Sequence, residues 1–309
     1  MGGLINVSSG PHVRDKVSTS MIMLIVIIAL MPTTLYGIYH FGVNAAILVA
    51  VCVVTCVLTE LIYELIFKMR VTVLDLSAVV TGLLLALNLP STVPWWMAVI
   101  GSVFAILVVK MAFGGVGQNF MNPALAARCF LLICFASRMT DFTYDGVSSA
   151  TPLAKIKNGE AVNLRDMIIG NIPGTIGETS VIAILIGAVI LLAFGIIGLQ
   201  IPLTYLITFV LFMGIFSGNG FDVDYLTAQL AGGGIMLGAF FMATDYATCP
   251  ITGKGKIIYG VLLGIMTGIL RVYSSSAEGV SFAIIICNLL VPLIDKFTIP
   301  KCFGKGGEV

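Results

Sequence analysis

Long apolar runs, separated by short polar turns, constrain the fold of this chain more than any other feature. A helix that crosses the hydrocarbon core of a bilayer needs roughly 20 mostly apolar residues. Ten runs approach this length, which predicts an all-α polytopic membrane protein with about ten transmembrane helices. The expected spans are Met21–Tyr39, Val43–Phe67, Val73–Leu89, Trp95–Phe113, Pro123–Ser137, Ser180–Leu199, Pro202–Ser217, Leu226–Thr244, Ile257–Tyr273 and Val280–Phe297.

The composition agrees with a membrane protein and excludes other classes. Hydrophobic residues make up 59% of the 309 residues, and charged residues make up 10%. Soluble domains carry about 25% charged residues, so we expect the interior to be organised by helix packing within lipid. The net charge of +1 gives no basis for binding nucleic acid. The first residues show no short apolar core with a cleavage site, so we expect the first span to be retained.

The expected spans form two sets of five around one long hydrophilic segment. An odd number of spans in each set gives the two halves opposite orientations, as in transporters built from inverted repeats. Weak similarity between Thr81-Gly82-Leu83 and Leu237-Gly238-Ala239, in the third and eighth spans, favours two inverted five-helix repeats. The expected division is an N-terminal segment 1–20, a first half 21–137, a loop 138–179, a second half 180–298 and a tail 299–309.

Basic residues in the short loops predict the orientation of the chain, because cytoplasmic loops of membrane proteins carry an excess of Lys and Arg. With the N-terminus inside, ten basic residues fall on the cytoplasmic side and five on the outer side. Both termini are therefore expected in the cytoplasm of a prokaryotic cell, with the loop 138–179 outside its cytoplasmic membrane. The cytoplasmic set is Arg14, Lys16, Lys68, Arg70, Lys110, Lys254, Lys256, Lys296, Lys301 and Lys305.

The long hydrophilic loop carries a group of hydroxyl side chains. Connections of about 40 residues are uncommon and are usually functional or disordered. Thr151 precedes Pro152, which biases Thr151 towards an extended backbone. We therefore expect its hydroxyl to be reachable by a modifying enzyme. A serine-rich turn that caps neighbouring helices is the alternative interpretation.

A second polar stretch, rich in glycine and side-chain amides, joins the fourth and fifth spans. It reads Gly-Gly-Val-Gly-Gln-Asn-Phe-Met-Asn-Pro-Ala, from Gly114 to Ala124. Glycines allow close backbone approach, and amides beside a helix N-terminus suit an anion or a polar heterocycle. No Gly-Lys-Ser/Thr follows, which excludes a phosphate-binding P-loop.

These stretches together resemble one family of membrane proteins. Gly114–Ala124, Ser9–His12, Asp75–Pro90 and Thr244–Pro250 are similar to segments of the D-type subunit of the Rnf-type ferredoxin:NAD+ oxidoreductase. Its homologue is the B-type subunit of the sodium-pumping NADH:quinone oxidoreductase. The loop order also resembles the flavinylation motif of that family, with a serine where the family has glycine. The matching motif residues are Asp145, Ser148, Ala150 and Thr151, and the serine is Ser149.

The resemblance implies an electron-carrying membrane subunit. Such subunits hold FMN through a phosphoester on the threonine that corresponds to Thr151, attached by an FMN transferase, and are associated with a non-covalent riboflavin. Their complex passes electrons from reduced ferredoxin to NAD+ and exports Na+ or H+. The partners are then the other subunits and the lipid bilayer, and this chain alone has no complete active site. The expected contacts of the second flavin are Gly114, Gly115, Asn119, Asn122 and Arg128.

Ionisable residues within the spans are costly in lipid and are functional by default. Arg128, near the middle of the fifth span, is expected to pair with a carboxylate or with an anionic flavin. Asp75 and Asp245 lie at the ends of their spans, where they are expected to contact a flavin or an ion path. The alternative for both is a helix-end charge that reaches the interface.

Two further sets of charged residues have simpler expected roles. Glu60 and Glu64 share one face of the second span, one turn before Lys68, which predicts an ion-pair ladder on the surface. Arg138 and Arg271 lie near the outer ends of their spans, where either can meet the FMN phosphate.

Cysteine and histidine spacing predicts no metal centre on this chain. The seven cysteines include no Cys-x-x-Cys pair, and the two histidines lie apart. Two other functions stay open. One is an inverted-repeat transporter or channel without a redox centre, and the other is a structural subunit that has lost its flavin. The motif at Thr151 favours the flavoprotein, because a transporter needs no flavinylation motif.

Overall fold

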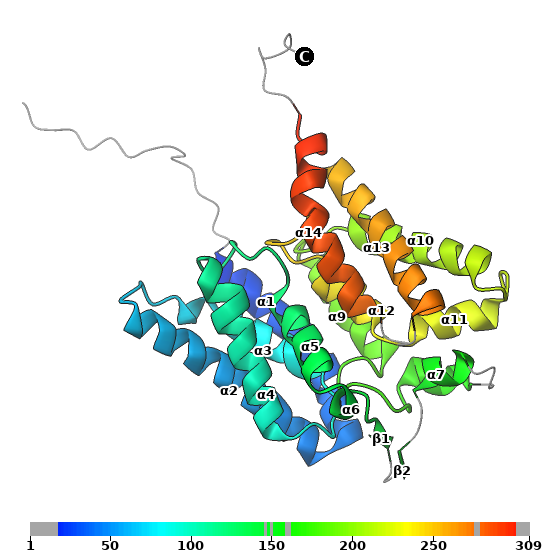
Figure 1. Ribbon diagram of the computed structural model, residues 1–309, viewed down its shortest axis with the longest axis horizontal. Helices are drawn as coiled ribbons and strands as arrows, with labels where there is room; N and C mark the ends of the chain where they lie inside the picture. The colour runs from blue at the N-terminus through cyan, green and yellow to red at the C-terminus, as the bar shows by residue number, and fades with distance from the viewer. Residues whose placement is uncertain (1–17, 145–146, 149–150, 158–161, 275–278, 301–309) are drawn as a thin grey trace, which may run out of the picture.

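The computed structural model describes residues 18–144, 147–148, 151–157, 162–274 and 279–300, and its regular structure is almost entirely helical (Figure 1). The first part contains α1 Thr19–Phe41, α2 Val43–Ile66, η1 Val73–Asp75, α3 Ser77–Leu87, α4 Trp95–Val103, η2 Phe104–Lys110, η3 Met111–Phe113 and α5 Pro123–Cys134. The middle contains α6 Ala136–Met139, β1 Thr143–Tyr144, β2 Val147–Ser148, α7 Pro152–Lys157 and α8 Leu164–Ile169. The last part contains α9 Val181–Ala193, α10 Gln200–Phe216, α11 Val223–Ala231, α12 Ile235–Leu237, η4 Gly238–Met242, α13 Gly253–Tyr273 and α14 Val280–Thr298.

Several helices are long and apolar enough to cross a membrane, which confirms a multi-pass helical membrane protein. Among the described residues, five continuous helices qualify: α1, α2, α4 together with η2 and η3, α13 and α14. A sixth candidate is the pair formed by α11 and α12–η4, which is bent by 64° at its break. The helices α3, α5, α9 and α10 are apolar but have only 10–17 residues. Ten complete crossings therefore stay a prediction, because four of the expected spans are shorter than a bilayer requires.

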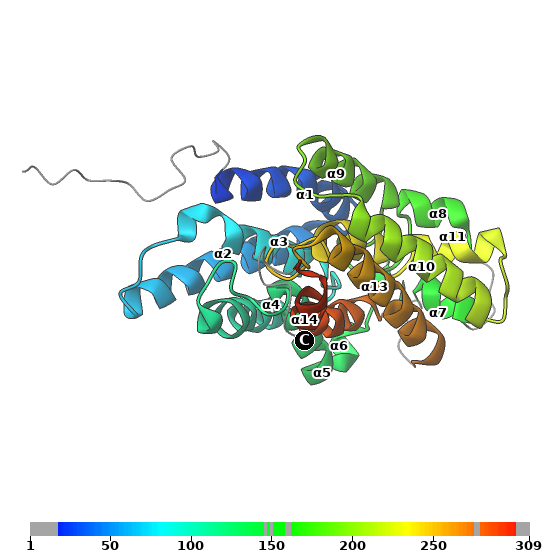
Figure 2. The same cartoon turned by 90° about the horizontal axis from the view of Figure 1, so that it is seen from above.

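The helices form two groups that lie side by side. Figures 1 and 2 place α2, α3 and α4 at one end of the molecule and α10, α11 and α13 at the other. In the first group α2 packs against α3 and α4, and in the second α10 packs against α13. Between the groups, α1 packs against α9 and α5 against α14. The opposite orientation of the two halves stays a prediction.

Small residues bring the helices of the second group into close contact. Gly260, Gly264 and Gly268 lie four residues apart along α13 and face α10. A Cβ atom on Gly264 would lie 2.8 Å from the backbone nitrogen of Phe209. Packing through small residues is the usual means of association within lipid, where burial of apolar surface gives little driving force.

The helices are irregular at η2, at η4 and at the break between α11 and α12. The segments η2 and η4 are π-helical, a geometry that often marks functional positions. The break between α11 and α12 is made by Gly233 and Gly234, whose φ angles of +65° and +69° favour glycine. Buried Arg271 stabilises this break, because its guanidinium donates to the backbone oxygens of Gln229 and Gly232.

The loop 138–179 is partly folded into the helical core. Its β1 and β2 form a short antiparallel pair. Farther along, the N–H of Ile176 donates to the backbone oxygen of Leu89 at 3.1 Å, and that of Gly177 donates to Leu87 at 2.8 Å. Ile176 is fully buried. The end of the loop therefore packs against the end of α3, although the sequence predicted a hydrophilic segment outside the membrane.

Candidate functional site

A cavity of about 280 Å³ lies where the two groups of helices meet. Its walls are mostly apolar side chains from α1, α3, α9 and η4, including Val26, Leu84 and Phe241. Polar groups also line it, several of them from segments that follow the π-helical stretches. They are Thr19, Ser77, Thr81, Lys110, Asn119, Asn122, Thr244, Asp245 and Tyr246. An apolar pocket with a few converging polar groups is the usual form of a site for a small molecule or cofactor. We call it the central cavity.

The two asparagines predicted to bind a flavin differ in whether their side-chain atoms already have hydrogen-bond partners within the protein. Asn122 begins α5 as its N-cap, with its Oδ1 accepting from the N–H of Ala124 at 3.1 Å and its Nδ2 donating to the backbone oxygen of Met242 at 3.4 Å. Asn119 is different, because its Oδ1 is buried and has no hydrogen-bond partner in the described residues. A buried acceptor without a donor is costly, so Asn119 has capacity for a ligand whereas Asn122 mainly holds α5 in place.

Asp245 lines the central cavity from the turn after η4, and its contact with a flavin or an ion path stays a prediction. Its carboxylate accepts from the N–H of Ala247 at 3.5 Å and from the hydroxyl of Thr248 at 3.4 Å. Desolvation raises the pKa of Asp245, and these two hydrogen bonds offset part of the shift.

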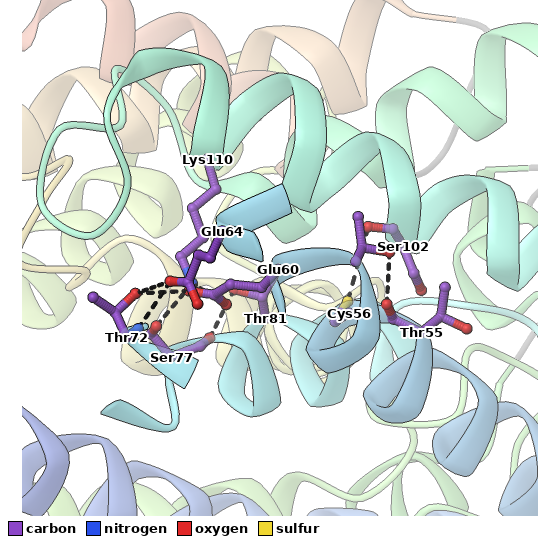
Figure 3. Close-up of polar contacts among 10 residues, drawn as sticks. Thr55, Cys56, Glu60, Glu64, Thr72, Ser77, Thr81, Ser102 and Lys110 are labelled. Atoms are coloured by element: carbon purple, nitrogen blue, oxygen red, sulfur yellow. Dashed lines mark hydrogen bonds and ion pairs between the residues drawn. The ribbon is translucent and has the colours of Figure 1, made fainter. Parts of the chain in front are cut away.

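A buried ionic cluster, whose polar contacts Figure 3 shows, contributes Lys110 and Ser77 to the lining of the central cavity. Lys110 donates to both carboxylate oxygens of Glu60 at 2.8 and 2.7 Å and to the hydroxyl of Ser77 at 2.8 Å. Glu64, one turn along α2, accepts from the N–H of Thr72 at 2.9 Å. Glu60, Glu64 and Lys110 have exposed fractions of 0%, 1% and 2%. We call these three residues with Ser77 and Thr72 the lysine cluster.

The lysine cluster corrects two sequence predictions. A surface ladder of Glu60 and Glu64 with Lys68 was wrong, because both glutamates point into the protein and no ion pair with Lys68 is present in the described residues. Lys110, counted with the basic residues of the cytoplasmic side, instead ends η2 inside the protein. The reason is that helical periodicity places two carboxylates on one face but does not say whether that face meets another helix.

A second cavity, of about 340 Å³, adjoins the lysine cluster, and its lining includes Glu64, Thr72, Asp75, Gly114 and Gly115. It shares Thr19 and Val116 with the lining of the central cavity. We call it the outer cavity, a name that refers to no side of the membrane. Gly114, Gly115 and Asp75 therefore face the outer cavity and not the central one. Asp75 is half-buried and accepts from the hydroxyl of Ser20 at 3.4 Å.

Arg128 is buried, as predicted, and pairs with a carboxylate. Its Nη1 donates to Glu178 Oε1 at 2.6 Å and to Asn88 Oδ1 at 2.8 Å. Asn88 in turn donates to the backbone oxygen of Leu84 at 2.6 Å. These contacts join α5, the end of α3 and the loop before α9. Arg128 does not line the central cavity, so the structure places it away from the predicted second-flavin contacts.

Thr151 precedes α7, and its Oγ1 accepts from the N–H of Ala154 at 3.4 Å. The residue is half-exposed. A polar cavity of about 310 Å³ adjoins α7 and is lined by Lys157 and Arg271. Of the other motif residues, Ser148 ends β2, whereas Asp145 and Ala150 lie outside the described residues. The second basic residue that we expected near the FMN phosphate, Arg138, is exposed and does not line this cavity.

The described residues include no group of three or more His, Cys, Asp or Glu side chains placed to hold a metal ion. The six described cysteines are free thiols, and four of them are buried. Sequence reasoning missed Glu178 and Asn88 as partners of Arg128. No local signal could identify them, because each is separated from Arg128 by 40 residues or more.

The helical architecture defines a multi-pass membrane protein with a mostly apolar cavity where its two groups of helices meet. Comparison with known proteins places the chain more closely: residues 6–304 match the model of the NQR2, RnfD, RnfE family, and the chain belongs to that family. It is 46% identical to the D-type subunit of the Na+-translocating ferredoxin:NAD+ oxidoreductase complex of Acetobacterium woodii, covering 97% of this chain and 95% of that protein.

Other relatives are named as the same subunit of such complexes. The D-type subunit of the proton-translocating ferredoxin:NAD+ oxidoreductase complex of Clostridium ljungdahlii is 36% identical over 97% of this chain and 96% of its own. The D-type subunit of the ion-translocating oxidoreductase complex of Erwinia tasmaniensis is 32% identical over 96% and 98%. The predicted family and its class of oxidoreductase complex are thereby confirmed.

Proposed function

We propose that this chain is the D-type membrane subunit of an ion-translocating ferredoxin:NAD+ oxidoreductase, and that it carries electrons through flavins. The named relatives support the complex. The flavin proposal rests on the central cavity and on Asn119 Oδ1, which is buried and has no hydrogen-bond partner among the described residues. We infer that FMN bound covalently at Thr151 and a non-covalent riboflavin serve as the two carriers. The other subunits supply the sites for ferredoxin and NAD+.

The residues of the central cavity fit the ring system of a flavin. That ring system has an apolar body and a polar edge with an imide N–H donor. The apolar walls suit the body, and Asn119 Oδ1 can accept from the imide. When bound, a flavin supplies one- and two-electron chemistry, and the protein supplies position and electrostatics. Asn122 stabilises the start of α5, which forms part of the cavity lining.

The surroundings of Thr151 fit a covalent FMN. Thr151 is a half-buried residue, and we expect an FMN transferase to reach it and join the FMN phosphate to Oγ1 as a phosphoester. Thr151 itself lines a small cavity of about 20 Å³ that also includes Glu178. The separate polar cavity along α7 carries the positive charges of Lys157 and Arg271, which favour an anionic cofactor there. A covalent bond keeps the cofactor from dissociating on the side where we expect this loop, outside the cytoplasm.

The test measures both flavins in one preparation. In-gel fluorescence of the denatured chain and peptide mass mapping detect the covalent flavin, and acid extraction detects the free one. We expect Thr151→Val to lose only the covalent signal, with Thr140→Val as the matched control in the same loop. We expect Asn119→Leu to lose only the extractable flavin, with exposed Asn171→Leu as its control. Absence of any flavin from wild-type protein, made in cells with an active transferase, would favour a transporter without a redox centre.

A further inference from the structure

The lysine cluster has more acidic than basic groups. Two buried carboxylates, of Glu60 and Glu64, face the single ammonium of Lys110 in the described residues. If all three groups are ionised, the cluster carries one uncompensated negative charge on side chains that are at most 2% exposed. Burial of an unpaired charge costs several kcal/mol, so the cluster is expected to hold one further positive equivalent. The other charged residues that line the outer cavity are Arg70 and Asp75.

Hydrogen-bond donors point to a proton as that equivalent. The Oγ1 of Thr72 contacts Glu64 Oε1 and also lies 3.5 Å from Glu60 Oε1. A hydroxyl has one proton and can donate to only one of these carboxylates. Lys110 spends its three protons on Glu60 and Ser77. Glu64 Oε2 is buried and has no partner in the described residues. A proton on Glu64 neutralises its charge and supplies the missing donor.

The position of the cluster suggests what this proton does. Glu64 and Thr72 line the outer cavity, whereas Lys110 and Ser77 line the central cavity. Each step from Glu64 through Thr72 and Glu60 to Lys110 spans 3.5 Å or less. The cluster thus forms an unbroken polar connection between the two cavities.

We infer that Glu64, Thr72, Glu60 and Lys110 form a proton-transfer path from the outer cavity to the central cavity. The inference rests on the proposed function, because reduction of a flavin in the central cavity creates the demand for a proton. Lys110 releases one proton into the central cavity through the hydroxyl of Ser77. The proton on Glu64 passes through Thr72 to the carboxylate of Glu60, and Glu60 passes a proton on to Lys110, which restores their ion pair. Glu64 then takes one proton from water in the outer cavity. Charge and protons balance, and the electrons come from ferredoxin through the complex.

The first measurement needs no flavin turnover. Infrared spectroscopy of the purified wild-type protein, with isotope-labelled glutamate, should show the C=O stretch of a buried protonated carboxyl that shifts in D2O. Glu64→Gln should remove this band, whereas Asp224→Asn, which changes an exposed carboxylate on α11, should keep it. A band that is absent from wild type, or that survives in Glu64→Gln, overturns the inference.

The second measurement follows proton uptake in the assembled complex with a pH-indicator dye after rapid chemical reduction. Loss of a proton-transfer group typically slows a step by about a hundredfold or more, so we expect Glu64→Gln to slow uptake to this extent with unchanged flavin content. Glu64→Asp should restore part of the rate, and Asp224→Asn should match wild type. Unchanged uptake in Glu64→Gln refutes the path.

The two proposals fail in distinguishable ways. Wild-type protein without extractable flavin would refute the riboflavin proposal while the infrared band still reports the proton on Glu64. If Glu64→Gln does not assemble, the labelled wild-type spectrum decides whether the cluster holds a proton.

Discussion

Two buried ion pairs in this protein, Arg128–Glu178 and Lys110–Glu60, are alike in geometry and differ in their surroundings. Their shortest N–O distances are 2.6 and 2.7 Å, and all four side chains are at least nine-tenths buried. Arg128 is matched to the carboxylate of Glu178 and lies away from the central cavity. Lys110 borders that cavity, and a second carboxylate, Glu64, lies within the same network.

The difference favours a structural role for the Arg128–Glu178 pair and a proton-exchange role for the Lys110–Glu60 pair. A matched pair between packed segments satisfies its own charges, and its contacts join α5, α3 and the loop before α9. A set of charges with one carboxylate in excess can gain a proton at lower cost, because protonation relieves the imbalance. Burial and distance alone do not distinguish these cases. The charge balance and the neighbouring cavities do.

The largest effect is expected when one partner of the matched pair is removed. Arg128→Met should destabilise the protein by about 3–5 kcal/mol, because Glu178 is left buried without its cation. Arg128→Met combined with Glu178→Met should regain most of this stability, since no charge remains unpaired. Chemical denaturation in detergent measures both, and extractable flavin content should stay near wild type in the double variant.

The matched double variant on the other side tests the comparison directly. Relative to Lys110→Met alone, the double variant Lys110→Met with Glu60→Met should regain less stability than the Arg128 and Glu178 double variant regains over Arg128→Met. The reason is that Glu64 keeps a buried carboxyl beside the lost pair. If the two doubles behave alike in stability and in flavin reduction, the distinction between a structural and an exchanging pair is wrong.

A smaller effect is expected from Gly234→Ala. A Cβ atom there would lie 2.3 Å from Glu178 Oε1, and the φ angle is +69°. Backbone strain in this region costs about 1–2 kcal/mol, and displacement of Glu178 from Arg128 should add to it. Gly195→Ala is the matched control, because its φ is +66° and no atom lies within 4 Å of the added Cβ. Equal melting temperatures for the two variants would show that Glu178 moves freely.

The smallest effect concerns Asp245, a carboxyl of the central cavity outside the lysine cluster. Desolvation raises its pKa in the folded protein, so the folded state holds more protons than the unfolded state above the unfolded value of about 4. Its contribution to stability therefore falls as pH rises through the window between the two values. Asp245→Asn should be more stable than wild type at neutral pH, and the advantage should shrink as pH falls through that window. Melting curves at several pH values test this, and a constant difference would contradict it.

Much of the helical framework could be predicted from the sequence. The ten apolar runs all lie on helices, and the Asn122-Pro123 start of α5 behaves as predicted, because capping and proline preferences are local. Burial of Arg128 was also predictable from its depth in an apolar run. The full number of crossings was less predictable, since an apolar run does not fix where its helix begins and ends.

The failures in the candidate site have one cause. Glu60, Glu64 and Lys110 look like helix-end charges in the sequence, where lysine and glutamate one turn apart usually face water. Their burial depends on α3 and η2 packing against the same face of α2. Asn119 is the opposite case, because the sequence singled it out and the structure leaves its Oδ1 buried and without a partner in the described residues.

The sequence by itself determined the membrane class, the helices and the polar motifs, since these follow from apolar length and local backbone preferences. Only the tertiary structure decided which charges meet. Glu178 reaches Arg128, and Lys110 reaches Glu60, across 50 residues of chain in each case. The physical reason is that the cost of a buried charge is relieved by whichever group the packed helices bring within hydrogen-bond distance, and local sequence patterns carry no information about that neighbour.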